Sequence, residues 1–210
     1  MNSTGRYNMP DGEIFTGPIE DSLNGWVKYT YPAIYGGVAV EGAELTFNRG
    51  RVQRATAEKN EDYLVKMLES DEGSRHVGEF AIGTNFDINK FTGNILFDEK
   101  IGGTFHMALG AGYPETGSKN KSAIHWDMIC DLRTDSEITV DGELFYKNGE
   151  VVFEKEVESW QVYCLRVVAQ KNPPLICLTC NFSTCNLQPI NRTPPTNPPS
   201  ARNRQSRLLR

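Results

Sequence analysis

The stretch SAIHWDMICD, residues 122–131, places a histidine and a carboxylate two positions apart. Alternate side chains of an extended strand point to opposite faces, so His125 and Asp127 would project together. The other face would be apolar and would carry Ile124, Trp126, Met128 and Cys130. An imidazole and a carboxylate on one face suit two ligands of one metal ion or of a neighbouring pair. On its own, the strand favours a simpler interpretation, a hydrogen-bonded histidine beside a solvated aspartate.

Three other segments repeat the pattern of a polar group on an otherwise apolar strand. Glu79 lies in HVGEFAIG, His106 lies in GGTFHMALG, and Glu13 follows a Pro-Asp-Gly turn in NMPDGEIFTG. Singly, each favours a structural role: a salt-bridged glutamate, a satisfied core histidine or an exposed turn acid. Together with the first strand they supply two Glu, two His and one Asp in a chain that has only 3 histidines.

This set of donors predicts a metal centre that has no thiolate ligand. Nitrogen and oxygen ligands suit divalent zinc, cobalt or manganese, and five are too many for one tetrahedral zinc. Two ions about 3.5–4 Å apart, bridged by one carboxylate, would use all five and leave positions for water and substrate. Such a pair makes hydroxide near neutral pH and polarises a carbonyl, which is the chemistry of amide hydrolysis.

The composition of the 210 residues, 39% apolar and 23% charged, is that of an ordinary globular protein and excludes no class. No apolar run reaches the length of about 18 residues that a membrane span needs. The first twenty residues lack the apolar segment of a signal peptide. We therefore expect a cytoplasmic protein without a membrane partner.

Charge and cysteine content divide the chain near Glu158. All 27 acidic residues and 15 of the 22 basic residues lie at or before this position, which gives this part a net charge of −12. The last 52 residues carry the other 7 basic residues and no acidic residue. Four of the 5 cysteines also lie in the last part. A change this sharp predicts a domain over residues 1–158 and a basic, Cys- and Pro-rich tail over 159–210. The composition of the tail from Asn186 predicts disorder.

The acidic part has the pattern of an α+β domain with mostly antiparallel strands and few helices. Apolar and polar residues alternate at 26–31 and at 43–47, which predicts strands. The turn NRG at 48–50 would join the second of these strands to residues 51–57 as a hairpin. Asp141-Gly142 and Asn148-Gly149 are typical of type I′ hairpin turns. Residues 58–69 predict the one clear helix, because their apolar side chains form a single stripe. We expect the metal site on one face of a sheet.

Four strings together resemble the catalytic half of the aminopeptidase T family: NMPDGEIFTGP, GEFAIGTN (78–85), ILFDEKIGGTFHMALGAGYPETG (95–117) and SAIHWDMICDLR (122–133). The match covers roughly residues 8–153. It implies a dinuclear metallo-exopeptidase that removes N-terminal residues from peptides, with Tyr113 as the active-site tyrosine, whose phenol would donate to the oxyanion. Structurally, Tyr113 also fits a loop tyrosine packed on the Pro114 turn. The implied metal ligands, with Glu79 as the bridge, are Glu13, Glu79, His106, His125 and Asp127.

Other acidic residues near these motifs are weaker candidates. Asp98 and Glu99 could support or extend the metal site, although a solvated loop pair is the better interpretation. Glu20 and Asp21 could hold the free amine of a substrate, with surface acids as the simpler alternative.

Two departures from the family pattern open alternative functions. Family members are about twice as long and carry an α/β domain before the catalytic half, and here only a few residues precede the first motif. A surface left uncovered by that domain favours association, for example as a homodimer. The segment after Glu156 resembles nothing in the family and reads more like translation in a wrong frame. The alternatives are an inactive metal-binding fragment, or a zinc-binding tail using Cys177, Cys180 and Cys185 that touches nucleic acid. With a single CxxC and scattered basic residues, we expect no nucleic-acid partner.

Overall fold

A computed structural model describes residues 2–3, 9–152, 160–161, 164–169, 176–181 and 186–187. Antiparallel strands dominate it, which confirms the expected α+β class with few helices. One sheet has five strands, all paired antiparallel. In spatial order they are β1 (Asn2–Ser3), β2 (Glu13–Thr16), β8 (Val77–Gly83), β9 (Thr104–Gly110) and β10 (His125–Asp131).

A second, eight-stranded sheet combines early and late parts of the chain, and its neighbouring strands are also antiparallel. In spatial order its strands are β13 (Glu150–Val151), β12 (Glu143–Lys147), β11 (Ser136–Val140), β15 (Cys164–Ala169), β16 (Ile176–Asn181), β3 (Asn24–Lys28), β6 (Glu44–Asn48) and β7 (Arg51–Thr56).

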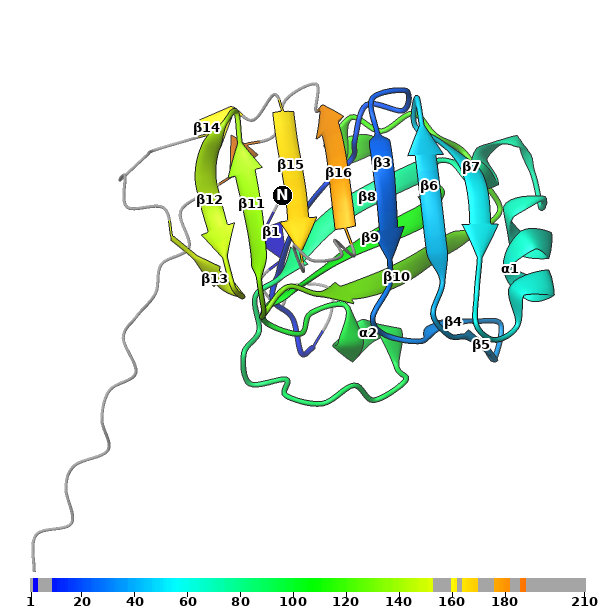
Figure 1. The fold of residues 1–210 in the computed structure, drawn as a ribbon, viewed down its shortest axis with the longest axis horizontal. Coiled ribbons are helices and arrows are strands. Elements are labelled where there is room, and N and C mark those ends of the chain that lie inside the picture. Colours follow the sequence, from blue (N-terminus) through cyan, green and yellow to red (C-terminus); the bar gives the residue numbers. More distant parts are fainter. Residues whose placement is uncertain are drawn as a thin grey trace, which may run out of the picture.

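The two sheets form two layers whose strands cross at an oblique angle (Figure 1). Each sheet contributes alternate residues to one hydrophobic core, because successive side chains on a strand point to opposite faces. Trp126, Met128 and Cys130 of β10 all belong to this core, as the sequence pattern predicts. Ile124, just before the strand, is also buried. The opposite face of the five-stranded sheet is thereby free to carry polar groups.

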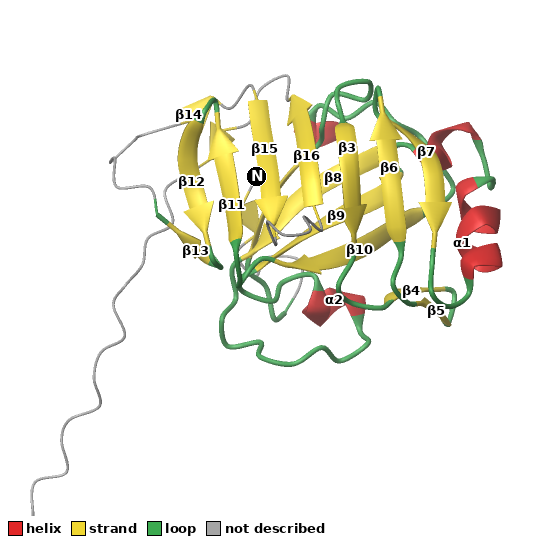
Figure 2. Cartoon of the chain, viewed as in Figure 1, coloured by secondary structure: helices red, strands yellow, loops and turns green. Residues whose placement is uncertain are grey.

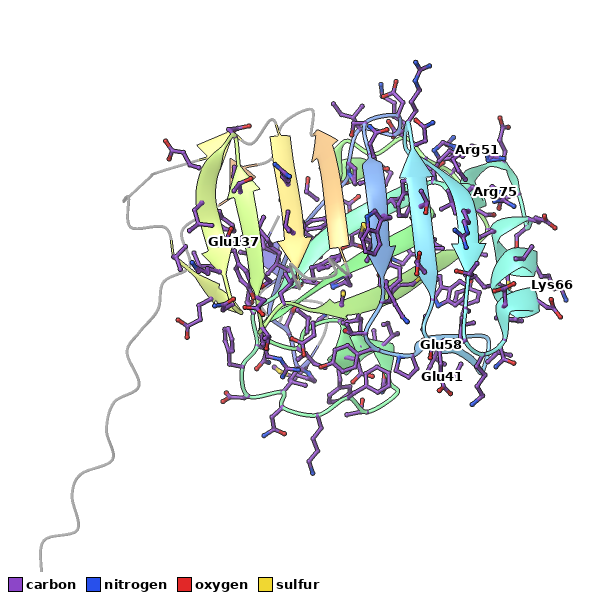
Figure 3. The ribbon with its side chains drawn as sticks, in the orientation of Figure 1. Glu41, Arg51, Glu58, Lys66, Arg75 and Glu137 are labelled. Carbon is purple, nitrogen blue, oxygen red and sulfur yellow. The ribbon has the colours of Figure 1, made fainter. Side chains whose placement is uncertain are left out.

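Short helices and a small hairpin lie around the sheets (Figure 2). The predicted helix is confirmed as α1 (Glu61–Leu68), and it starts later than expected because Asn60 adopts a left-handed conformation with φ 60°. Leu64 and Leu68 are buried, whereas Lys66 points away from the sheets (Figure 3). The remaining elements are α2 (Ile95–Asp98), the 3₁₀ turns η1 (Glu72–Arg75) and η2 (Pro114–Thr116), and the hairpin of β4 (Ala33–Tyr35) with β5 (Val38–Val40).

The predicted hairpin turns are confirmed by backbone geometry. Asp141 and Gly142 have φ values of 50° and 87°, and Asn148 and Gly149 have 49° and 89°. Positive φ at both central residues is what a type I′ turn requires, and such turns connect β11 to β12 and β12 to β13.

The eight-stranded sheet crosses the boundary that the change in composition predicts near residue 158. β15 pairs with β11 and β16 pairs with β3, so two strands from the basic segment close the gap between residues 136–147 and 24–48. Leu165 and Val167 of β15 are buried. Farther along, β17 (Asn186–Leu187) pairs with β14 (Trp160–Gln161). Disorder is predicted from Asn186 onward. Residues 188–210 lie outside the described part of the chain, as does the candidate zinc ligand Cys185.

Among the described residues, no helix combines the length and the apolar character that crossing a membrane would require.

Candidate metal centre

The five predicted ligands come from four neighbouring strands and meet on one face of the five-stranded sheet. Glu13 begins β2, Glu79 lies in β8, His106 lies in β9, and His125 and Asp127 lie in β10. Four of them are at most 7% exposed, and His125 is partly exposed at the edge of the cluster. Segments far apart in the sequence are thus brought together, as the ligand pattern requires.

Strand register explains why these side chains converge. Ala108 of β9 pairs with Glu79 on one side and with Asp127 on the other, so the two carboxylates flank a small side chain in the same row. His106 lies two residues before Ala108, on the same face. Alanine leaves room above the sheet where a larger residue would fill the space between the carboxylates.

Within the described ranges, three groups of side chains have one ligand atom per residue within 4.8 Å of the others. The first contains Glu13, Glu79 and His106, and the second contains Glu79, His125 and Asp127. Glu79 is common to both groups, which is the position a bridging carboxylate would occupy. A third group contains His106, Asp127 and Glu99, the last being one of the weaker candidates from the sequence.

The ring of His125 is oriented by a backbone contact. Its Nδ1 lies 2.7 Å from the carbonyl oxygen of Ala111, so Nδ1–H donates to that oxygen and Nε2 is the ring nitrogen that faces the carboxylates. Nε2 lies 3.3 Å from Glu79 Oε2 and 3.6 Å from Asp127 Oδ1. Metal-binding histidines commonly use one nitrogen for such a backbone contact and offer the other to the ion.

Two buried carboxylate oxygens in the cluster, Glu13 Oε2 and Asp127 Oδ1, have no hydrogen-bond partner among the described residues. Glu13 Oε2 lies 3.3 Å from His106 Nε2. Buried carboxylate oxygens are costly to desolvate unless a donor or a cation meets them. Unsatisfied oxygens that point toward imidazole nitrogens fit a divalent cation, so the residues present suit the metal that the ligand set implies.

In the absence of an ion, Glu13, Asp127 and His125 of the cluster have raised pKa values. Burial raises the pKa of Glu13 to about 7, against opposing effects of His106 and Lys100. Burial also raises the pKa of Asp127. For His125, burial lowers the pKa, but Glu79 and Asp127 raise it by more, to about 9. A divalent cation among these groups would lower the pKa values of the two carboxyl groups and of His125, because it favours ionised carboxylates and neutral imidazoles.

Tyr113 lies on the loop between β9 and β10, next to the cluster. Its ring centroid is 5.1 Å from that of His125, and Phe15 contacts it edge-on at 6.0 Å. Tyr113 is 42% exposed, so it is accessible from solvent beside the cluster. Burial on its inner side and the nearby carboxylates raise the pKa of Tyr113 to about 12, so the phenol keeps its proton at neutral pH.

Comparison with known proteins decides the family. The model of the thermophilic metalloprotease (M29) family matches residues 2–155. The chain belongs to this family. The resemblance to aminopeptidase T expected from the sequence is thereby confirmed.

Several curated M29 relatives are aminopeptidases by name. Aminopeptidase AmpS of Bacillus subtilis is 36% identical and aminopeptidase 2 of Geobacillus stearothermophilus is 34% identical; each alignment covers 70% of this chain and 40% of the relative. Aminopeptidase T of Thermus thermophilus is 31% identical, with 68% and 37% covered. The chain therefore spans about two fifths of the length of these relatives.

Two solved structures are similar to this chain. Wild-type AmpT from Thermus thermophilus matches with a TM-score of 0.62 at 29% identity, covering 70% of this chain and 41% of that one. A 2,5-dihydroxypyridine dioxygenase from Pseudomonas putida matches with a TM-score of 0.50 at 20% identity, which shows a likeness of fold alone.

The weaker acidic candidates separate into two sets. Glu99 forms one of the three candidate groups, with His106 and Asp127. Asp98 faces elsewhere and accepts hydrogen bonds from the backbone N–H and the hydroxyl of Thr92. Glu20 accepts a hydrogen bond from the Lys119 backbone N–H. Neither Asp98 nor Glu20 belongs to a metal-ligand group within the described ranges, nor does the exposed Asp21.

One residue of the centre escaped the sequence reasoning. Lys100 is fully buried, with its ammonium 3.1 Å from Glu13 Oε1 and in close contact with Glu99. Burial lowers the pKa of Lys100, but the two carboxylates raise it by more, so it stays charged. The signal was weak because lysine beside glutamate in FDEK is typical of an exposed loop. The apolar and glycine-rich residues that follow it, IGGTF, were the only hint of burial.

Proposed function

We propose that this chain is the catalytic part of a metal-dependent aminopeptidase that removes N-terminal residues from peptides and uses two divalent ions. The observation that carries the proposal is the convergence of two ligand groups on Glu79, with unsatisfied buried oxygens on Glu13 and Asp127. One ion would be held by Glu13, Glu79 and His106, and the other by Glu79, His125 and Asp127. The nitrogen and oxygen donor set favours zinc, cobalt or manganese.

Ions bound here would activate a water molecule and polarise the scissile carbonyl. The chain's own residues do the rest. Ala111 holds the His125 ring so that Nε2 faces the carboxylates. Tyr113 keeps its proton and donates it in a hydrogen bond to the developing oxyanion. Because Tyr113 is partly exposed, a peptide can approach from its side of the cluster.

Proteins named aminopeptidases support this choice of substrate, since they are similar to this chain over most of its described length. A second candidate follows from the coverage: a chain that spans about two fifths of those relatives could bind metal without turning over peptide. For the domain division, residues 1–158 remain the proposed catalytic domain, since the family match ends at residue 155. β15 and β16 would then complete its eight-stranded sheet from the segment that follows.

Hydrolysis of a peptide with a free N-terminus, compared with the same peptide acetylated, tests the proposal. We expect turnover of the free peptide that requires added zinc, cobalt or manganese and falls at least about a hundredfold in His125→Ala. Metal binding without turnover would select the second candidate. Cleavage of the acetylated peptide at the same rate would exclude an aminopeptidase.

A further inference from the structure

Lys100 is a buried cation beside the candidate ligands, and it is paired with two carboxylates. Its ammonium contacts Glu13 Oε1 at 3.1 Å and also contacts Glu99, which is not in the proposed ligand set. A lysine that is 0% exposed is rare unless it is paired, because desolvating an ammonium is costly. Here, two carboxylates provide that pairing.

The loop that carries Lys100 is tied to the strand that carries Glu13. The backbone N–H of Asn85 donates to the carbonyl oxygen of Lys100 at 3.0 Å, and the Asn85 side chain donates to the carbonyl oxygen of Asp11 at 2.8 Å. The N–H of Thr84 donates to the carbonyl oxygen of Gly12 at 2.9 Å. These bonds fix the distance between Lys100 and the beginning of β2, so the contact with Glu13 is built into the fold.

As a result, the two carboxylate oxygens of Glu13 have different partners. Oε1 is taken by the ammonium, whereas Oε2 faces His106 Nε2 at 3.3 Å and has no hydrogen-bond partner among the described residues. Only Oε2 is therefore available to an ion. Lys100 also adds a permanent positive charge to a cluster that contains the carboxylates of Glu79, Glu99 and Asp127 besides Glu13.

We infer that Lys100 is a positioning residue of the metal centre. It occupies Oε1 of Glu13, so that Glu13 binds an ion through Oε2 alone, and it adds a positive charge to the site. This inference rests on the dinuclear site proposed above. In this proposal Lys100 is not itself a ligand: its ammonium contacts Glu13 and Glu99. It acts through Glu13, so its removal should change how the metal is bound as well as how stable the protein is.

Lys100→Met tests the inference, with Lys90→Met as the matched control because Lys90 is exposed in the segment between β8 and α2, on the other side of α2 from Lys100. Without metal, loss of the buried cation should lower the melting temperature of Lys100→Met by about 10 °C. Saturating zinc should remove most of that deficit, because the ion replaces the missing charge. Lys90→Met should match the wild type with and without metal.

Two further readouts separate positioning from a purely structural role. The visible absorption bands of the cobalt-loaded protein should shift in Lys100→Met, since Glu13 can then use both oxygens. In an active preparation, kcat should fall about 10- to 100-fold with KM and metal content unchanged. If Lys100→Met folds only with metal present, Lys100→Gln refolded with cobalt provides the same spectrum, and a shift there supports the inference equally.

A deficit in melting temperature that is the same with and without zinc, together with an unshifted cobalt spectrum, would overturn the role of Lys100 and leave the metal site standing. Absence of bound metal from the folded wild type would overturn the proposed function and this inference together.

Discussion

Asp71 is the main link between the α1–η1 segment and the segment that leads into β10. Its carboxylate accepts hydrogen bonds from the Ser74 backbone N–H and hydroxyl, both at 2.9 Å, from the Ser122 hydroxyl at 2.9 Å, and from the Ala123 backbone N–H at 2.6 Å. His125 follows two residues later. We predict that Asp71→Asn destabilises the fold and loosens the start of the strand that carries this ligand.

The magnitude follows from the geometry. A hydrogen bond to a charged acceptor contributes about 1.5–3 kcal/mol. Asparagine keeps one acceptor oxygen but turns an NH₂ group toward the remaining donors, so some of these bonds are lost. We expect a loss of about 2–3 kcal/mol in the free energy of unfolding. For a chain of this size that corresponds to roughly 5–10 °C in melting temperature.

The loss should depend on pH in a defined direction. Hydrogen bonds, that from the Ala123 N–H first, lower the pKa of Asp71 to about 2 in the folded protein, from an ordinary value of 3.8. The stabilisation by the carboxylate is therefore complete above pH of about 5 and disappears as the pH falls through about 2. The difference between wild type and Asp71→Asn should narrow over that range.

Urea denaturation from pH 7 downward, for as long as the native state persists, measures this difference. Glu72→Gln is the matched control, because Glu72 is an exposed acid in the same turn and should change stability by less than about 0.5 kcal/mol. A difference between wild type and Asp71→Asn that stays constant down to pH 3, or that is no larger than the control, would refute the role of the carboxylate.

Three further outcomes are expected. Gly50→Ala should destabilise by about 2 kcal/mol more than Gly37→Ala: both have positive φ, but a Cβ at Gly50 would overlap the Glu20 carbonyl oxygen, whereas Gly37 has open space. Equal effects in urea denaturation would contradict this close approach. Tyr113→Phe should lower kcat about a hundredfold with metal content intact; a change in KM alone would make Tyr113 a substrate-binding residue. Because burial raises the pKa of Cys130 to about 12, mass spectrometry after iodoacetamide treatment of the native protein at pH 8 should find it unmodified. Labelling there as fast as in urea would show that the core opens.

The parts of the fold that the sequence predicts well are those governed by local rules. The type I′ turns at Asp141-Gly142 and Asn148-Gly149 require residues that tolerate positive φ, and those residues are present. Strand alternation around Trp126 assigns the core face correctly, since a one-residue shift would have buried His125 and Asp127 in the core instead. The amphipathic stripe likewise locates α1 around Leu64.

What the sequence could not predict depends on partners distant along the chain. The insertion of β15 and β16 between β11 and β3 is a long-range pairing with no local signal, and the composition of that segment argued for a separate tail. Lys100 is paired in the interior with its neighbour Glu99 and with Glu13, which is 87 positions away in the sequence. The convergence of Glu13 with the other ligands depends in the same way on sheet order.

Metal content is the most direct test of the central claim. After dialysis against zinc or cobalt and removal of free metal, elemental analysis should find about two ions per chain in the wild type. His125→Ala should lose at least one ion and most of the metal-induced rise in melting temperature. In the wild type, the stabilisation behind that rise is roughly 2.7 kcal/mol when free metal is a hundred times Kd. His76→Ala is the control, because this third histidine belongs to none of the ligand groups within the described residues. Equal metal content in His125→Ala and wild type would remove His125 from the site, and no bound metal in a folded wild type would contradict the metallopeptidase account.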